Sequence, residues 1–213
     1  MPYTHWYVIY QLVSGVSTAP LTREARKEQT REAIIAAATK LFSWDGIEST
    51  SLDRIAKEVG LTKGAIYSTF ASKDELVEAV ADANSVSIGD ELLFDPSVPL
   101  RKVLQSLADE LLAVRKKLTR DQFVLFLELF LYERRHGSWG KRVTAERRAG
   151  NAEDVPRLEQ AMKERRNEKL LVPASEFLLA LNAIAIGIVL QLERDPESLS
   201  PGSVVTLFES LVE

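Results

Sequence analysis

Apolar residues in this chain recur every three or four positions from residue 22 onward, which is the spacing of helices with one buried face. Similar stripes lie within residues 100–114, 174–193 and 201–212, and strand-like alternation is not part of the pattern beyond residue 21. The pattern therefore predicts an all-α protein. The clearest stripe lies within a helix predicted over residues 22–44 and consists of Ile34, Ala37, Ala38, Leu41 and Phe42.

Residues 51–70 are predicted to form two short helices joined by a tight turn. Ser51 and Thr62 are suited to begin the two helices, because a hydroxyl group can accept a backbone N–H of the first turn. Gly60 lies where the first helix ends, and glycine adopts the left-handed conformation of such a turn without steric cost. Two helices joined in this way form a helix-turn-helix, whose second helix can enter the major groove of DNA.

The second of these helices carries small or polar side chains that are predicted to face DNA. Lys63 can donate to guanine acceptors, while Tyr67 and Lys73 are placed to reach phosphate oxygens. Tyr67 could instead be a core aromatic, and Phe70 is expected to be one. The predicted DNA-binding residues are Thr50, Ser51, Thr62, Lys63, Gly64, Ala65, Tyr67, Ser68, Thr69 and Lys73.

Several residues in this region match the pattern of a known family. They are Gly46, Thr50-Ser51, Ile55-Ala56, Gly60-Leu61, Lys63-Gly64-Ala65-Ile66-Tyr67, Phe70 and Ser72-Lys73-Asp74-Glu75-Leu76. On these residues the chain resembles the TetR family of one-component transcriptional regulators, strongly over residues 28–83 and loosely elsewhere.

The resemblance implies a cytoplasmic repressor with two helical parts. A three-helix DNA-binding domain is expected at residues 22–88, and a helical bundle that dimerises and binds a small-molecule effector is expected at residues 99–213. The resemblance also implies that a helix over residues 72–87 moves like a pendulum and transmits the effector signal. Residues 1–21 are expected to be a disordered tail, since a short aromatic run leads into a Ser-, Gly- and Pro-containing linker. That run has no preceding basic residue, so a signal peptide is not expected.

Two capping boxes, Ser72–Glu75 and Thr119–Gln122, predict further helix starts. The helix after Thr119 is apolar at nine of ten positions from 123 to 132, which predicts that it is buried on every side. Its exception, Glu128, is expected to face water, to pair with Arg142 or Arg166, or to lie at the edge of a cavity, because a buried unpaired carboxylate is costly.

An aromatic pocket for an apolar or mildly cationic effector is predicted in this region, with an ordinary filled core as the alternative. The pocket residues are Phe123, Phe126, Glu128, Phe130, Trp139 and Met162. Downstream, Gly150-Asn151 and Pro156 predict a kink or a short loop within residues 137–166.

A two-fold homodimer is predicted through the last two helices. The helix over residues 174–193 is apolar on more than one face, and small residues recur along it where another helix could approach closely. The alternative is a central helix buried within one chain, and its apolar run over residues 177–192 is expected to be too short to cross a bilayer. A dimer would present two recognition helices to a palindromic operator. The predicted interface residues are Ala180, Ala183, Ile184, Gly187, Leu207, Phe208 and Leu211.

Composition argues against other classes of function. The net charge is −4, and residues 21–76 carry nine basic and nine acidic side chains, so DNA affinity must come from placed contacts. Cysteine is absent and the two histidines, His5 and His136, have no motif around them, so no catalytic site, metal site or cofactor is predicted. The alternatives are a regulator controlled by a partner protein, or a helical-bundle enzyme.

Overall fold

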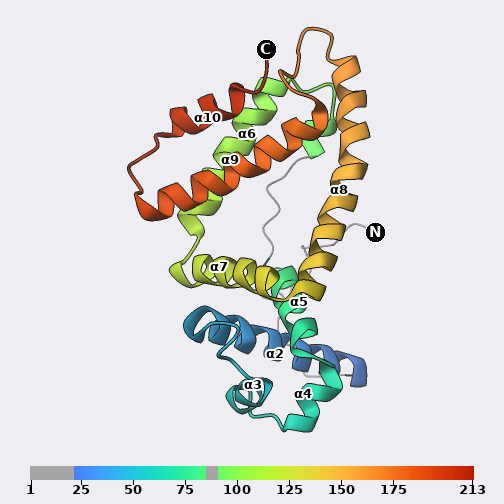
Figure 1. Cartoon of the computed structure of the whole chain (residues 1–213), viewed down its shortest axis with the longest axis vertical. Helices are drawn as coiled ribbons and strands as arrows, with labels where there is room; N and C mark the ends of the chain where they lie inside the picture. Colours follow the sequence, from blue (N-terminus) through green and yellow to red (C-terminus); the bar gives the residue numbers. More distant parts are fainter. Residues whose placement is uncertain (1–21, 85–90) are drawn as a thin grey trace.

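The computed structural model describes residues 22–84 and 91–213, and within these ranges the chain is helical apart from one isolated β-bridge between Leu170 and Val212. The expected tail at residues 1–21 and the end of the helix expected over residues 72–87 lie outside the described residues. Figure 1 shows how the helices are arranged. They are α2 (Arg23–Asp45), α3 (Leu52–Glu58), α4 (Lys63–Thr69), α5 (Lys73–Ala83), the 3₁₀ helix η1 (Glu91–Phe94), α6 (Leu100–Lys117), α7 (Arg120–Arg135), α8 (Gly137–Glu164), α9 (Ala174–Arg194) and α10 (Pro201–Glu209).

Hydroxyl side chains begin many of these helices, as the sequence predicts. At Thr119 the capping box is complete, because the Gln122 side chain accepts the Thr119 N–H. At Ser72 the box is displaced by one residue, since the Glu75 carboxylate accepts the N–H of Ala71 at 2.7 Å. The first turns of α2, α3, α4, α5 and α7 donate a backbone N–H to Thr22, Ser51, Thr62, Ser72 and Thr119, respectively.

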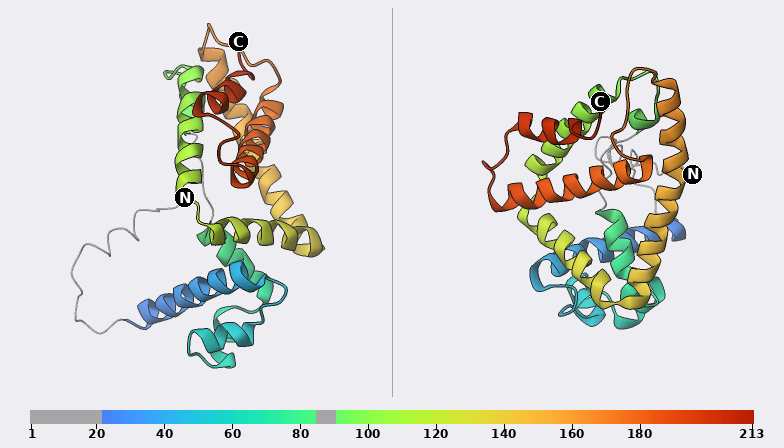
Figure 2. Two further views of the ribbon diagram at one scale, coloured as in Figure 1. Left: turned by 90° about the vertical axis from the view of Figure 1, so that its left-hand side faces the viewer. Right: turned by 45° about the horizontal axis from the view of Figure 1, so that its top comes forward.

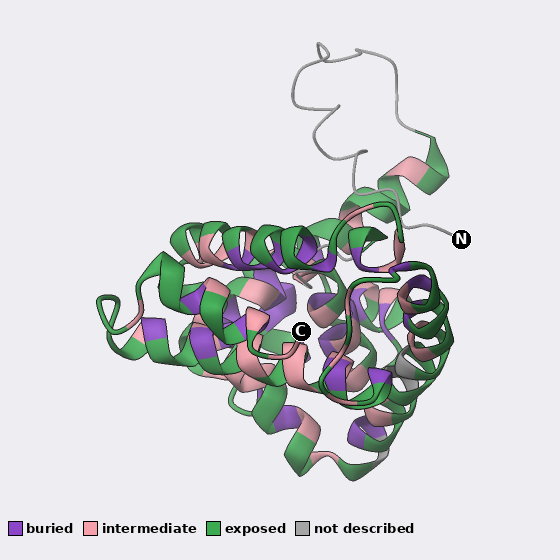
Figure 3. Cartoon of the chain, turned by 90° about the horizontal axis from the view of Figure 1, so that it is seen from above, coloured by how far each residue is buried: buried purple, intermediate pink, exposed green. Residues whose placement is uncertain are grey.

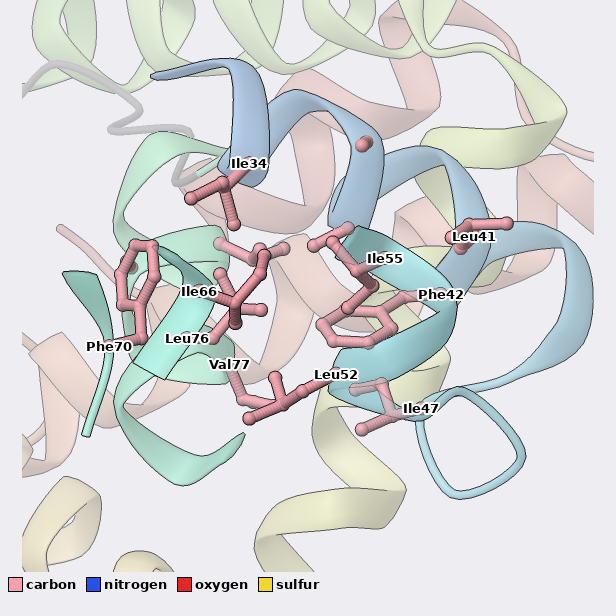
Figure 4. Close-up of a cluster of buried hydrophobic side chains, with 14 of the residues drawn as sticks. Ile34, Leu41, Phe42, Ile47, Leu52, Ile55, Ile66, Phe70, Leu76 and Val77 are labelled. Carbon is pink, nitrogen blue, oxygen red and sulfur yellow. The ribbon is translucent and has the colours of Figure 1, made fainter. Parts of the chain in front are cut away.

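The first hydrophobic core joins α2, α3, α4 and α5 (Figure 4). Phe42 and Phe70 are fully buried in it, which confirms the expected core position of Phe70. Three residues of later helices, Leu125, Tyr132 and Trp139, belong to the same core. The helix-turn-helix unit is therefore closed on one side by α7 and the first turn of α8.

A second core lies at the other end of the molecule, among α6, α9, α10 and the C-terminal half of α8 (Figures 1 and 2). Phe177 of α9 and Leu104 and Leu111 of α6 are fully or almost fully buried there. Viewed along the long axis, buried positions lie on the inward sides of these helices (Figure 3).

Helix α8 links the two cores. It is one continuous helix over Gly137–Glu164, and Gly150 and Pro156 both lie within it. Of the kink or short loop predicted there, the loop is therefore wrong, and the kink stays a prediction. A proline within a helix lacks the N–H that would bond to the preceding turn, and its ring crowds the carbonyl group there, so Pro156 favours a kink in α8. Trp139 near one end of α8 packs in the first core, and Leu158 near the other end packs in the second.

The segment over residues 91–99, which leads into α6, is held by a buried arginine at the end of α8. The Arg165 guanidinium donates to the carbonyl oxygens of Leu92, Leu93, Asp95 and Val98 at 2.6–3.1 Å, and its side chain is only 2% exposed. Burial lowers the pKa of Arg165. These carbonyls belong to η1 and the turn after it, so Arg165 fixes the start of the second helical part. The sequence gives no signal for this role.

Candidate nucleic-acid interface

The helix-turn-helix is formed by α3 and α4 around Gly60, which has a φ of 69°. The N–H of Leu61 donates to the carbonyl oxygen of Ala56 at 2.8 Å and ends α3. Ile55 and Ile66 are fully buried and attach the two helices to α2. These contacts leave one side of α4 facing away from the core.

The exposed side of α4 carries most of the predicted contact residues. Lys63, Gly64 and Ser68 are exposed, and the ring of Tyr67 is 46% exposed, so Tyr67 is not a core aromatic. A Cβ atom added at Gly64 would lie 4.0 Å from the Thr62 hydroxyl oxygen, its nearest neighbour, so a partner could approach this backbone closely. Ala65 and Thr69 are half-buried at the flanks of this surface.

Thr50 does not belong to that surface. It is fully buried, and its hydroxyl donates to the carbonyl oxygen of Gly46 at 2.9 Å. The prediction that Thr50 faces DNA is wrong, because the residue stabilises the turn between α2 and α3. Ser51 is exposed but its hydroxyl accepts the Arg54 N–H as the cap of α3.

The two predicted lysine contacts differ in their surroundings. The Lys63 ammonium is 2.8 Å from the Asp53 carboxylate and 5.7 Å from the centre of the Tyr67 ring, and the Asp53 hydrogen bond raises its pKa. Lys73 is half-buried, its ammonium donates to the carbonyl oxygen of Glu48 at 3.3 Å, and burial lowers its pKa. Lys63 therefore presents the more accessible positive charge.

Polar contacts between α7 and the helix-turn-helix unit were not predicted. The Tyr132 hydroxyl donates to the Asp74 carboxylate at 2.6 Å, and His136 Nε2 lies 2.7 Å from Glu48 Oε1. The hydrogen bond from His136 lowers the pKa of Glu48, while burial and the bond to Asp74 raise the pKa of Tyr132. A capping signal at Ser72 was visible in the sequence, but the pairing of Asp74 with a residue 58 positions away was not.

The predicted pocket residues do not come together. Trp139 is buried in the first core, and Met162 packs against the second. The Glu128 carboxylate accepts the N–H of Ile47 at 2.9 Å, so its partner is a backbone group of the α2–α3 turn rather than an arginine.

The prediction that α7 is buried on every side is also wrong. Leu125 and Tyr132 are buried, but the rings of Phe126 and Phe130 are 40% and 55% exposed, and Phe123 is half-buried. The three phenylalanines lie on the face of α7 opposite to Leu125, at i, i+3 and i+7. The first core covers only one side of α7, so its other side stays open.

The predicted dimer residues fall into two groups. Phe208 is 2% exposed within the second core of its own chain, so it is not available to a partner, and Ala180, Ile184 and Leu211 are half-buried. Ala183, Gly187 and Leu207 are exposed.

Helix α9 exposes more apolar surface than the predicted interface residues alone. Leu179, Ile186 and Leu190 are 63%, 40% and 41% exposed, respectively, and form a stripe with Ala183. Helix α9 has 21 residues, and by length and composition alone it is long and apolar enough to cross a membrane. The expectation that it is too short is therefore wrong. Of its most apolar 18-residue stretch, 17% is buried.

Comparison with known proteins identifies the helix-turn-helix unit. The family model "Bacterial regulatory proteins, tetR family" matches residues 34–80, which extend from α2 to α5. The regulator AcrR of Shigella flexneri is 38% identical over 93 residues, covering 39% of this chain and 43% of AcrR. The chain thus aligns with less than half the length of this curated relative.

Solved structures extend the likeness to nearly the whole chain. NalD of Pseudomonas aeruginosa, a secondary repressor of the MexAB-OprM multidrug efflux pump, is 27% identical and matches 87% of this chain and 95% of its own with a TM-score of 0.58. GusR of Salmonella enterica, at 22% identity, has the same fold over 90% of this chain and 97% of its own, with a TM-score of 0.67. The family model and the curated relative agree on the helix-turn-helix unit, and the solved structures extend the helical fold to the rest of the chain: residues 34–80 belong to the TetR family of helix-turn-helix transcriptional regulators.

Proposed function

We propose that this chain is a repressor that binds a palindromic DNA operator as a homodimer and is released by a small apolar effector. The observation that carries the proposal is the exposed side of α4, where Lys63, Gly64, Tyr67 and Ser68 project from an otherwise closed core. A helix presented in this way fits the major groove, and lysine can donate to guanine. The similarity to NalD, which is described as a repressor, supports repression rather than activation.

The homodimer is supported by the apolar stripe on α9. Leu179, Ala183, Ile186 and Leu190 recur at helical spacing, and Leu207 of α10 is 40% exposed. A contiguous apolar surface of this kind is typical of an interface. A second copy would cover the stripe by two-fold symmetry and would place two α4 helices on half-sites about 34–36 Å apart, one turn of DNA.

The effector surface is proposed on the open face of α7, formed by Phe123, Phe126 and Phe130. Figure 1 places α9 on the side of α7 that faces away from α2. Partly exposed aromatic rings gathered on one face of a helix suit an apolar ligand. Glu128 is left out of this surface because its carboxylate is bonded to Ile47.

The DNA part is tested by selecting sequences from a random duplex library with the full-length protein. A palindromic motif is expected. Lys63→Ala should cost about 1–3 kcal/mol and relax the preference at one base-pair position, whereas Lys73→Ala should weaken binding on every sequence and flatten the salt dependence. Failure to enrich any motif would contradict the proposal.

The dimer and the effector are tested separately. Light scattering at micromolar concentration should give twice the chain mass of 23.8 kDa, and a mass for one chain would contradict the dimer. A thermal-shift screen of lipophilic compounds should find ligands that raise the apparent stability and release the protein from DNA. Phe126→Ala should reduce the response to such a compound, with Glu128→Gln as the comparison. Control by a partner protein is the second candidate, and it is favoured if no compound shifts the stability.

A further inference from the structure

Two stacked rings at the C-terminal end of α7 form hydrogen bonds to the segments before and after the helix-turn-helix. The rings of Tyr132 and His136 are parallel within 17°, with centroids 3.8 Å apart. Tyr132 donates to Asp74, which lies just after α4, at 2.6 Å. His136 bonds to Glu48, which lies just before α3, at 2.7 Å. A single unit on α7 therefore holds the two segments that bracket the DNA-reading helices.

We infer that Tyr132 and His136 are positioning residues that couple α7 to the orientation of the helix-turn-helix, and that adding a proton to His136 strengthens this coupling by turning its hydrogen bond to Glu48 into an ion pair. The inference rests on the proposed DNA-binding function. It differs from a pendulum movement of α5 alone, because Glu48 lies in the turn that precedes α3, on the opposite end of the motif from α5.

Several charged groups lie around His136. Glu48 lies directly against it, and the Asp74 carboxylate accepts a hydrogen bond from Tyr132, whose ring stacks on His136. His136 is both the C-cap of α7 and the N-cap of α8, so the dipoles of the two helices act on it in opposite directions. Two cations also lie nearby, since Lys73 of α5 and Arg135 of α7 both act on Glu48.

Imidazole is the side chain that changes charge within the physiological pH range. At low pH the pair is a charged hydrogen bond between His136 and Glu48, and at high pH the cation is lost. Because the two side chains are 35% and 46% exposed, the effect is modest. Exposed ion pairs contribute about 0.2–1 kcal/mol, which corresponds to a change in affinity of up to about fivefold.

The first test measures the affinity of the full-length protein for the duplex selected from the random library, at pH 6, 7 and 8 and constant ionic strength. Affinity should fall about threefold from pH 6 to pH 8 in the wild-type protein. The fall should vanish in His136→Gln and persist in His5→Gln, which removes the chain's second histidine. A wild-type affinity independent of pH, or an equal pH dependence in His136→Gln, would overturn the coupling.

The second test follows the His136 ring by NMR in the protein without DNA. Glu48→Gln removes the anionic partner and should lower the midpoint of the ring titration; an unchanged midpoint would show that the contact does not form. This measurement does not depend on DNA binding. If the protein bound no DNA, the proposed function would be contradicted, but the ring titration would still show whether His136 and Glu48 are in contact. Tyr132→Phe keeps the stacked ring but loses the bond to Asp74. Tyr132→Phe should weaken DNA binding while retaining the pH dependence. Unchanged affinity would show that the bond between Tyr132 and Asp74 does not contribute to the coupling.

Discussion

Helices α7 and α9 are both rich in apolar residues, but only α7 finds a buried side in contact with the DNA-reading part of the chain. Leu125 and Tyr132 of α7 complete the first core, and Glu128 bonds to the turn after α2. Helix α9 packs one side on the second core and leaves Leu179, Ile186 and Leu190 exposed. The difference teaches that the apolar content of a helix predicts that its surface will be buried against another element. The apolar content does not predict which element that is.

The largest effect should separate the two sides of α7. Leu125→Ala removes a side chain that is 1% exposed and should lower the free energy of unfolding by about 2–5 kcal/mol, because a cavity forms in the first core. Phe130→Ala removes a ring that is 55% exposed and should change it by no more than about 0.5 kcal/mol. Urea denaturation measures both. Equal losses would show that the open face of α7 is covered in solution.

The next effect concerns the attachment of the second core to the segment after α5. Arg165→Met removes a buried donor that bonds to four carbonyl oxygens and should lower the free energy of unfolding by about 3 kcal/mol. Arg165→Lys keeps the charge but not the planar fork, so an intermediate loss is expected. A destabilisation below about 1 kcal/mol in Arg165→Met would mean that water replaces the guanidinium.

A third prediction probes the exposed face of α9. A Cβ atom at Gly187 would meet no atom of its own chain within 4 Å, so Gly187→Leu should leave the monomer folded. It should block close approach of a second copy and weaken dimerisation and DNA binding together, by at least about tenfold, or about 1.4 kcal/mol. Gly150→Leu on α8 is the matched control, since that position is equally open. Sedimentation equilibrium and DNA titration are the measurements, and a dimer of unchanged strength in Gly187→Leu would place the interface elsewhere.

The smallest effect is the pH dependence of stability at Glu48. Its pKa is lowered from 4.5 in the folded protein, first by the hydrogen bond to His136, so its contribution is present above pH 4.5 and is lost as the pH falls through the folded-state pKa. Because the side chain is 46% exposed, the loss should stay below about 1 kcal/mol. Stability measured from pH 6 to pH 3 should therefore fall slightly less in Glu48→Gln than in the wild-type protein. An identical acid profile would mean that Glu48 does not pair with His136.

The helix-turn-helix could be predicted from the sequence because its determinants are local. Thr62 caps α4, Gly60 takes a positive φ, and Ile66 and Phe70 repeat at helical spacing. Each of these acts within one or two turns of the chain, where residue type and spacing are sufficient. The exposed position of Lys63 follows from the same spacing, whereas the spacing left Tyr67 open as a core aromatic and the structure decided its exposure.

Only the tertiary structure decided which distant residues meet. The carboxylate of Glu128 finds the backbone of Ile47 across 81 positions, and Arg165 finds carbonyl groups about 70 positions earlier. Thr50 has the residue type of a DNA contact, yet the fold buries it in a turn. The sequence determined where helices begin, where they end and which faces are apolar, because those depend on neighbours along the chain. The pairing of buried polar groups depends on how whole helices pack, since a carboxylate or guanidinium bonds whichever backbone group the packing brings within reach.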